Sequence, residues 1–491
     1  MKILKVFKNQ YFYLGLILIV AFLVRLYKVD APIADWHSWR QADTAAVTRN
    51  FIKDGFNPVL PKYDDMSGAS ETPLANVNRF RFVEFPLYNI AVYPLYLLFG
   101  VNDIYHRLVS IFFSLGSIIF IFLVAKKYAG VLTALLSALI SALLPFNVFF
   151  SRTTLPEPTF VFFALGMIYF MDSWIWERKR IWMFWGFVFS VLAFLIKPWA
   201  IFFYLPLLYS VYKQENRKAF LFRKFIPATL ILLLPFILWR FWILQQPEGI
   251  PASKWLLNGD NIRFRPAFFW WIISERLGRE ILGVTGFVLL VLGVLIKPKN
   301  RNYFLHFFLL SIFLYFVTFA TGNVRHNYYQ ILFVPIASIF VSLGFISLIK
   351  NENNFIIRFW TIPIAFALFF LSFYFSYKMV KEFYKINNPI IIEVGKITDS
   401  ILPSDALVLA PYNGDTAFLY QTNRAGWPVV PLSIKEMVVD YGITHYVSVS
   451  KDNQANWVKR HFEVLVDDPK FIIANLQKVT LDFDDINDPQ P

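Results

Sequence analysis

The sequence predicts an α-helical polytopic membrane protein with about 11 transmembrane helices, interfacial helices in the first outer loop and a small C-terminal extracytoplasmic α/β domain. Three observations lead to this fold class. The 491 residues are 57% hydrophobic and only 16% charged, and a mean hydropathy of +0.51 is too high for a soluble enzyme of this size. Apolar runs of roughly 17 to 22 residues recur along the chain. Lys and Arg gather in short clusters between these runs, as in cytoplasmic loops.

The composition also excludes several classes of function. The formal net charge is +14, but the basic residues lie between apolar runs, so we expect them to face anionic lipid and predict no nucleic-acid partner. The chain has no cysteine. Disulfides, thiolate metal sites and a cysteine nucleophile are therefore excluded.

The first apolar run is predicted to be a retained membrane span. Lys2, Lys5 and Lys8 precede it, which places the N-terminus in the cytoplasm. The run has no small-residue cleavage site and continues into Arg25, so we do not interpret it as a signal peptide.

The other basic clusters fix the direction of the later spans if all of them face the cytoplasm. All of these clusters can face the cytoplasm only when the run 86–100 does not cross the membrane. That run is short and contains Pro94, and we predict an interfacial or re-entrant helix. The predicted spans are 11–29, 104–125, 131–150, 159–176, 181–196, 199–212, 226–244, 280–297, 303–320, 329–349 and 358–377.

The spans divide the chain into a transmembrane domain, 1–378, whose first extracytoplasmic loop is 30–103, and an extracytoplasmic domain, 379–491. The composition of the tail changes to the alternation typical of globular proteins. We expect buried strands at 406–410 and 446–449 and helices near 391–401, 433–440 and 453–461.

The first outer loop is too polar to cross a membrane but contains enough aromatic residues to lie on the bilayer as short helices. Asp43 follows two tryptophans in this loop. Shielded from water, its carboxylate could accept a proton as a general base. It could equally pair with Arg40 or Arg49 and only orient the loop.

Two glutamates close to prolines also allow either a functional or a structural interpretation. Glu84 precedes Pro86, and Glu157 lies between Pro156 and Pro158. Each could orient a substrate or hold a divalent cation. Each could also be an ordinary acidic residue at the start of a helix. The sequence requires no cofactor and leaves a divalent cation open.

Basic and aromatic residues mark two further outer ends of spans. Lys197 ends an apolar run, where it could bind a lipid phosphate or could reach up to the lipid headgroups. The segment 323–330 combines a guanidinium, an imidazole and phenols, a set suited to phosphate oxygens but also typical of an aromatic belt. When the Lys and Arg clusters are placed in the cytoplasm, all these groups lie on the outer side of the membrane, which suggests a single extracytoplasmic site. Its candidates are Arg40, Asp43, Glu84, Arg152, Glu157, Lys197, Arg325, His326, Tyr328 and Tyr329.

This ordered set resembles the C-type membrane glycosyltransferases, the GT-C class, in the branch of the protein O-mannosyltransferases and lipid A aminoarabinose transferases. The resemblance covers roughly residues 10–350 and rests on the order of motifs. Thr44 stands where the family often has Glu, and Phe85 where some relatives have a basic residue. A phosphate contact could then come from Arg40, Arg79 or Arg81. The motifs are Asp43, the segment 84–88, Arg107, Arg152 with Pro156-Glu157, Lys197-Pro198 and the segment 326–329.

The resemblance implies an inverting transferase in a bacterial or archaeal plasma membrane. It would move a sugar from a polyprenyl-phosphate carrier to an acceptor outside the cytoplasm. Asp43 would be the base or orient the acceptor, and Glu84 would lie beside the sugar. Lys197, with Arg325 and His326 or Tyr328, would stabilise the departing lipid phosphate.

Two other functions compete with this interpretation. A membrane transporter or lipid flippase predicts polar groups in mid-membrane and symmetry between halves, and neither stands out in the sequence. A scaffold that presents the outer domain leaves the charges at the span ends unexplained. The tail could bind the acceptor, recruit a partner or brace the loops, and its residues of interest are Asp415, Tyr420, Arg424 and Trp427. The identities of the sugar and the acceptor depend on pocket shape.

Overall fold

The computed structural model describes residues 9–71, 75–214, 217–350 and 358–480. The chain forms two compact units. The helical unit comprises Met1–Val29, Arg107–Phe241 and Ser253–Tyr384, and the mixed unit comprises Asp30–His106, Trp242–Ala252 and Lys385–Pro491. This division differs from the predicted boundary at residue 378, because the first loop groups with the tail.

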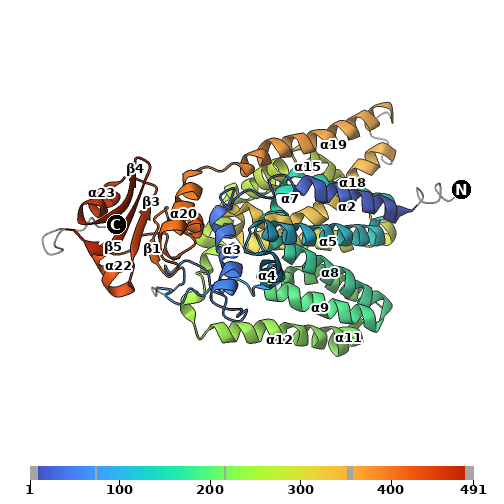
Figure 1. Cartoon of the computed structure of the whole chain (residues 1–491). Helices are drawn as coiled ribbons and strands as arrows, with labels where there is room; N and C mark the ends of the chain where they lie inside the picture. The colour runs from blue at the N-terminus through green and yellow to red at the C-terminus, as the bar shows by residue number, and fades with distance from the viewer. Residues whose placement is uncertain (1–8, 72–74, 215–216, 351–357, 481–491) are drawn as a thin grey trace. The chain divides into compact units, whose positions relative to one another are not determined.

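The helical unit consists of long apolar helices joined by short turns (Figure 1). Its closest helix pairs are α8 with α9 and α15 with α18. Its helices are α2 (Gln10–Arg25), α5 (Ile104–Ala129), α6 (Val131–Leu143), α7 (Pro145–Phe150), α8 (Glu157–Glu177), α9 (Arg180–Ile196), η1 (Pro198–Phe203), α10 (Tyr204–Tyr212), α11 (Arg217–Phe220), η2 (Leu221–Phe225), α12 (Ile226–Ile243), α13 (Lys254–Asn258), η4 (Gly259–Phe264), α14 (Pro266–Trp270), η5 (Trp271–Ile281), α15 (Thr285–Leu295), α16 (Phe304–Thr318), α17 (Ala320–Arg325), η7 (Asn327–Phe333), α18 (Val334–Lys350) and α19 (Arg358–Val380).

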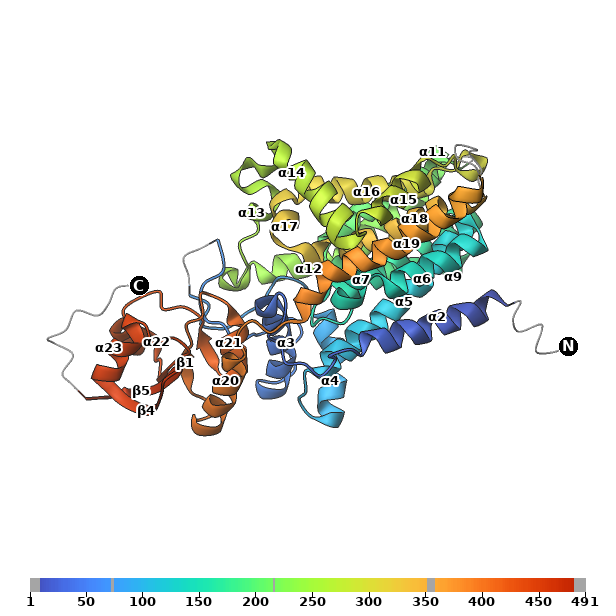
Figure 2. The same ribbon diagram turned by 90° about the horizontal axis from the view of Figure 1, so that it is seen from above.

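Most predicted spans coincide with these helices, but 131–150 is divided at Leu144 into α6 and α7, and the number of helices that cross the membrane stays a prediction. In the described part of the chain, five helices are long and apolar enough to cross, and a bent pair gives a sixth. Shorter apolar helices of 10–17 residues account for the remaining predicted spans. Figure 2 shows α15, α16, α18 and α19 running along one another within this unit.

The predicted span 280–297 begins later in the structure than the sequence suggested. The helix α15 starts at Thr285, after a bend of 112° from the segment Pro266–Ile281. Gly283 lies in this bend with φ +56°, and a Cβ there would come within 2.1 Å of the Ser372 carbonyl oxygen. Only glycine allows the chain to turn this closely against α19.

The first loop contains two helices, of which the first is buried within the mixed unit, and their placement on the bilayer stays a prediction. The helix α3 (Ser38–Lys53) has every residue from Arg40 to Phe51 buried. It packs on α4 (Leu87–Phe99) and on α21 (Thr416–Gln421) of the tail. The helix α4 has 13 residues and contains Pro94, as predicted for the run 86–100, and its interfacial placement stays a prediction.

The tail is an α/β fold, as predicted. Its sheet has the order β2-β1-β3-β5-β4, with β1 parallel to β2 and β3, and β5 antiparallel to β3 and β4. The predicted strands and helices of the tail are all present. The elements are α20 (Ile390–Ile401), β1 (Leu407–Leu409), α21, β2 (Ala425–Trp427), α22 (Ile434–Tyr441), β3 (His445–Ser448), α23 (Asn453–His461), β4 (Phe462–Asp468) and β5 (Phe471–Val479).

The first loop and the tail share one hydrophobic core inside the mixed unit. Ala45 and Phe51 of α3 belong to the same buried cluster as Val394 of α20, Val408 of β1 and Phe418 of α21. Because burial of such side chains is the main stabilising contribution to a fold, neither segment completes this core alone. The tail therefore fixes the position of α3 and of the polar residues on it.

Candidate active site

Asp43 of α3 is held by a cation and a hydroxyl. Its Oδ2 lies 2.7 Å from Nη2 of Arg81, and its Oδ1 lies 2.7 Å from the hydroxyl of Thr416 in the tail. The side chain is only 5% exposed. The sequence offered Arg40 or Arg49 as ion-pair partners, and this was wrong: Arg49 pairs with Asp64, and Arg40 pairs with Glu84. Arg81 lies 38 residues further along the chain, beyond the reach of helix spacing rules.

Arg40 and Glu84 form a second buried ion pair in the mixed unit. Nη2 of Arg40 donates to Oε1 of Glu84 at 2.6 Å and to Oε2 at 2.8 Å. Arg40 lies three residues before Asp43, so both side chains project from neighbouring positions on α3. Both predicted carboxylates are therefore anchored by arginines, with Asp43 on α3 and Glu84 in the irregular stretch that precedes α4.

Two further carboxyl groups, which the sequence did not single out as an acid pair, interact with Asp43. Burial, together with repulsion by the Asp43 carboxylate, raises the pKa of Asp65 to about 7. Burial also raises the pKa of Asp415, which accepts hydrogen bonds from the Ser38 hydroxyl and the Ala417 amide. Asp65 follows another aspartate in an irregular loop, and no spacing signal in the sequence could have identified it.

The raised pKa of Asp65 predicts that stability falls as the pH rises. Between about pH 4 and pH 7 the folded protein keeps a proton on Asp65 that the unfolded chain releases, so unfolding becomes easier with increasing pH. The difference of about 3 pKa units corresponds to at most roughly 4 kcal/mol. We expect Asp65→Asn to remove this loss, so that the melting temperature at pH 8 exceeds that of the wild type by several degrees.

The measurement is the melting temperature of the purified protein at intervals from pH 5 to pH 8. Asp467→Asn is the matched control, because two lysines lower the pKa of Asp467 to about 2, below this range. An identical pH slope in the wild type and in Asp65→Asn would contradict the prediction.

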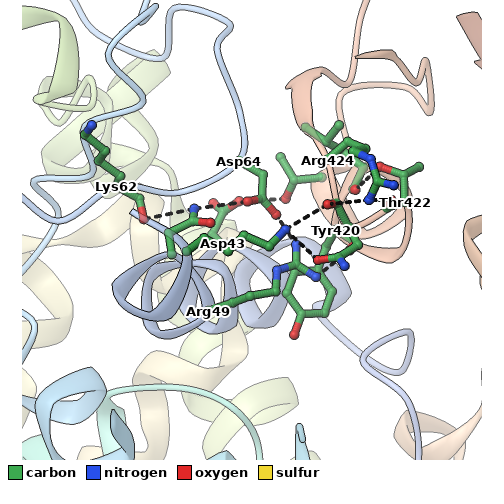
Figure 3. A network of polar contacts seen from close by, with 12 residues as sticks. Asp43, Arg49, Lys62, Asp64, Tyr420, Thr422 and Arg424 are labelled. Atoms are coloured by element: carbon green, nitrogen blue, oxygen red, sulfur yellow. Dashed lines mark hydrogen bonds and ion pairs between the residues drawn. The ribbon is translucent and has the colours of Figure 1, made fainter. Parts of the chain in front are cut away.

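A polar network ties the tail to α3 (Figure 3). Arg49 forms an ion pair with Asp64 and donates to the Tyr420 carbonyl oxygen at 3.0 Å. Its guanidinium also lies 4.0 Å from the centre of the Tyr420 ring. Arg424 donates to the carbonyl oxygens of Pro403 and Leu402 and pairs with Asp399. Tyr420 and Arg424, which the sequence singled out in the tail, thus serve the packing of the mixed unit.

The helical unit brings Lys197 and Glu157 together. Nζ of Lys197 lies 3.4 Å from Oε1 of Glu157, and the two side chains are 5% and 2% exposed. Lys197 follows the last residue of α9, and Glu157 opens α8. The Lys197 ammonium also lies 5.0 Å from the Trp199 ring. Neither the lysine nor the glutamate is a simple surface anchor.

The aromatic segment η7 adjoins this pair through Trp199. The Tyr329 ring lies 4.6 Å from the Trp199 ring and 4.6 Å from the Tyr328 ring. His326 stacks on Tyr328 with the ring centres 5.5 Å apart. Tyr328 and Tyr329 are buried, so they do not form the lipid-facing belt that the sequence allowed as an alternative. Lys197, Tyr328, Tyr329 and His326 form a connected basic and aromatic group.

Arg325 and Arg152 occupy different surroundings. The Arg325 side chain is 57% exposed and faces Asp260 and the Trp255 ring. Arg152 is fully buried, donates to the Lys28 carbonyl oxygen at 2.9 Å and lies 4.5 Å from the Tyr384 ring. Arg107 donates to the same carbonyl oxygen at 3.0 Å. Arg152 and Arg107 thus both bind the turn that follows α2.

The candidates therefore fall into two groups, one in each unit. The mixed unit holds Arg40, Asp43 and Glu84, and the helical unit holds the other seven. The carboxylates considered as metal ligands, Glu84 and Glu157, each face a cationic side chain. Among the residues that the structure describes, no three His, Asp or Glu side chains are arranged to hold a metal ion.

Comparison with known proteins identifies the fold. Residues 86–242 match the family model described as dolichyl-phosphate-mannose-protein mannosyltransferase. No curated protein sequence matches significantly. Among solved structures, ArnT from Cupriavidus metallidurans, bound to undecaprenyl phosphate, superposes with a TM-score of 0.65 at 14% identity, over 94% of this chain and 97% of ArnT.

A second structural match is more distant. The archaeal oligosaccharyltransferase AglB from Archaeoglobus fulgidus, in complex with an inhibitory peptide and a dolichol-phosphate, gives a TM-score of 0.56 at 10% identity. The match covers 95% of this chain and 74% of AglB. At these identities the agreement is one of fold. The chain is an integral membrane protein with the fold of C-type glycosyltransferases, which confirms the resemblance drawn from the order of its motifs.

Proposed function

We propose that this protein transfers a glycosyl group from a polyprenyl-phosphate-linked donor to an acceptor on the extracytoplasmic side of a bacterial or archaeal plasma membrane. The observation that carries this proposal is the buried ammonium of Lys197 in its aromatic surroundings. A buried lysine is costly unless it is paired, and such groups in membrane proteins usually serve a ligand. The match of residues 86–242 to a family that uses a lipid-phosphate sugar supports the same chemistry.

In this proposal the helical unit binds the donor. Glu157 pairs with Lys197 in the absence of substrate, and the incoming phosphate then competes for the ammonium. The hydroxyls of Tyr328 and Tyr329, the ring of His326 and the exposed guanidinium of Arg325 supply further donors. A fixed set of donors stabilises negative charge as it develops on the leaving phosphate.

The mixed unit serves the acceptor. An acceptor hydroxyl oxygen attacks the anomeric carbon, and the bond from that carbon to the phosphate oxygen breaks with its electron pair leaving on the phosphate. The proton of the hydroxyl passes to the carboxylate of Asp43. Arg81 and Thr416 hold that carboxylate in one orientation, and attack opposite to the leaving phosphate inverts the anomeric centre. Glu84, oriented by Arg40, accepts hydrogen bonds from sugar or acceptor hydroxyls.

The experiment that tests this function is native mass spectrometry of gently purified protein. We expect the wild type to retain polyprenyl-phosphate species, with or without sugar, and Lys197→Ala to lose most of them. Lys179→Ala is the matched control, because Lys179 forms an exposed ion pair with Glu177 on the same unit. Ordinary phospholipids bound equally to all three proteins, with no carrier on any, would contradict the proposal and favour the transporter or scaffold interpretation.

The contact between Thr416 and Asp43 predicts that the tail affects the transfer step. Thr416→Val removes the hydroxyl while keeping the shape of the side chain, so the Asp43 carboxylate loses one of its two anchors. A hydrogen bond to a charged group contributes about 1.5–3 kcal/mol, so we expect kcat to fall roughly tenfold or more. The KM for the donor should stay unchanged. Thr416→Ser, which keeps the hydroxyl, should retain activity, and an equal loss in both variants would show that the contact is only structural.

A further inference from the structure

A basic recess lies in the helical unit at the end of α5 where Lys126 and Lys127 are found. The loop between α15 and α16 and the last turns of α18 form its other walls, and its volume is about 440 Å³. Lys126, Lys297 and Lys299 line it, together with Lys350. None of the described lining residues is an aspartate or a glutamate.

The recess is separate from the donor group around Lys197. Lys127 forms an ion pair with Asp172, near the end of α8, whereas Glu157 opens the same helix. A separation of 15 positions corresponds to about 22 Å along a helix. Asp172 neutralises Lys127, so the positive charge available to an anion in the recess is that of Lys126, Lys297 and Lys299.

Within the described part of the chain, no aspartate or glutamate forms an ion pair with Lys126, Lys297 or Lys299 of the recess. Lys126 contacts the Tyr11 hydroxyl at 3.2 Å and lies 5.1 Å from the Tyr11 ring, both neutral partners. Lys297 and Lys299 are exposed at the mouth of the recess. Like charges brought together in this way repel one another unless an anion lies between them.

The opposite wall of the recess is apolar. Leu343 and Ile346 of α18 line it one turn apart with partly exposed side chains, and the fully buried Phe340 lies one turn further along the same helix. A soluble phosphate needs only the lysines, whereas a phospholipid has a phosphate for the lysines and acyl chains for an apolar wall. Because the recess has both lysines and an apolar wall, it is better suited to a phospholipid than to a soluble anion.

The walls are held in place by contacts that do not involve the lysines. The Tyr128 ring stacks on Phe304 with centres 4.2 Å apart, and the Tyr303 amide donates to the Tyr209 hydroxyl at 2.9 Å. A ring nitrogen of His306 lies 3.0 Å from the Val294 carbonyl oxygen. These contacts fix the loop between α15 and α16, so the recess is formed before any ligand binds.

We propose that this recess binds the headgroup of an anionic phospholipid, with the phosphate between Lys126, Lys297 and Lys299 and an acyl chain along the apolar wall of α18. By the charge rule this end of the helices faces the cytoplasm, where anionic lipids attract basic segments. Basic pockets between membrane helices on that side are suited to such headgroups. The proposal is independent of the glycosyltransferase function.

The test is native mass spectrometry of the full chain released from nanodiscs that contain phosphatidylcholine and phosphatidylglycerol. We expect one phosphatidylglycerol to stay bound to the wild type, with occupancy at least fivefold lower in Lys297→Ser/Lys299→Ser. The control is Lys179→Ser/Lys218→Ser, which removes two exposed lysines from positions that do not line the recess. Equal melting temperatures in pure phosphatidylcholine establish that all three proteins are folded.

Two results would overturn the proposal. Equal occupancy in the recess variant and the control variant would mean that the lysines act only through general attraction to the membrane. Displacement of the bound lipid by millimolar inorganic phosphate would assign the site to a soluble anion. Retention of the lipid in the presence of phosphate, with loss only in the recess variant, supports a phospholipid site.

Discussion

Replacing Asp43 by asparagine is expected to reduce glycosyl transfer by roughly 10²- to 10⁴-fold, the usual contribution of a general base. Asparagine keeps the size of the side chain and an oxygen that can accept from Thr416. It cannot take the acceptor proton. The measurement is transfer of a labelled sugar from a polyprenyl-phosphate donor, together with binding of the donor, which should stay unchanged.

Asp43→Asn removes the proton acceptor, but it also leaves the largely buried guanidinium of Arg81 without its carboxylate. The control must separate these two effects. The double variant Asp43→Asn/Arg81→Gln removes both charges. If Asp43 is the base, the double variant stays inactive although its melting temperature recovers. Recovery of transfer in the double variant would show that Asp43 only holds Arg81 in place.

Replacing Lys197 by methionine is expected to lower kcat by about 10²- to 10³-fold, comparable to removing one donor from a site that stabilises developing negative charge. Methionine fills a similar volume without a charge. The carrier lipid should also bind more weakly, because in the proposed mechanism Lys197 holds the phosphate before and after transfer. The measurements are single-turnover transfer and the dissociation constant for polyprenyl phosphate.

Lys197→Met also leaves Glu157 buried beside an uncharged side chain. Breaking a buried ion pair in this way typically costs 3–5 kcal/mol of stability. The control is Lys197→Met/Glu157→Gln, which removes both charges and should recover the melting temperature without recovering transfer. Normal transfer by this double variant would exclude Lys197 from the proposed role and leave the pair a structural one.

Most elements of the fold could be predicted from the sequence because their signals are local. The length of the apolar runs located the helices, and α20, α22 and α23 of the tail lie where the apolar spacing placed them. The start of α15 was placed too early, because the bend at Gly283 depends on how closely α19 approaches. The burial of α3 was missed because its covering helix, α21, comes from the far end of the chain.

The candidate site could be predicted as a set of residues but not as a set of contacts. Asp43 was identified from its place after two tryptophans in the first outer loop, and Lys197 from its position at the end of an apolar run. Their partners were not: Arg81 replaced the partners expected for Asp43, and Glu157 was not linked to Lys197. No sequence pattern identified Asp65, since its raised pKa arises from burial and from a neighbouring carboxylate.

The sequence by itself determined the class of protein, the position of its apolar helices and the residue types available for chemistry, because hydropathy and residue order are properties of the chain alone. Only the tertiary structure decided which charges meet. Thr416 and Asp43 are 373 residues apart and share a hydrogen bond because the loop and the tail fill one core. Pairing of buried charges depends on packing between distant segments, and no local pattern records it.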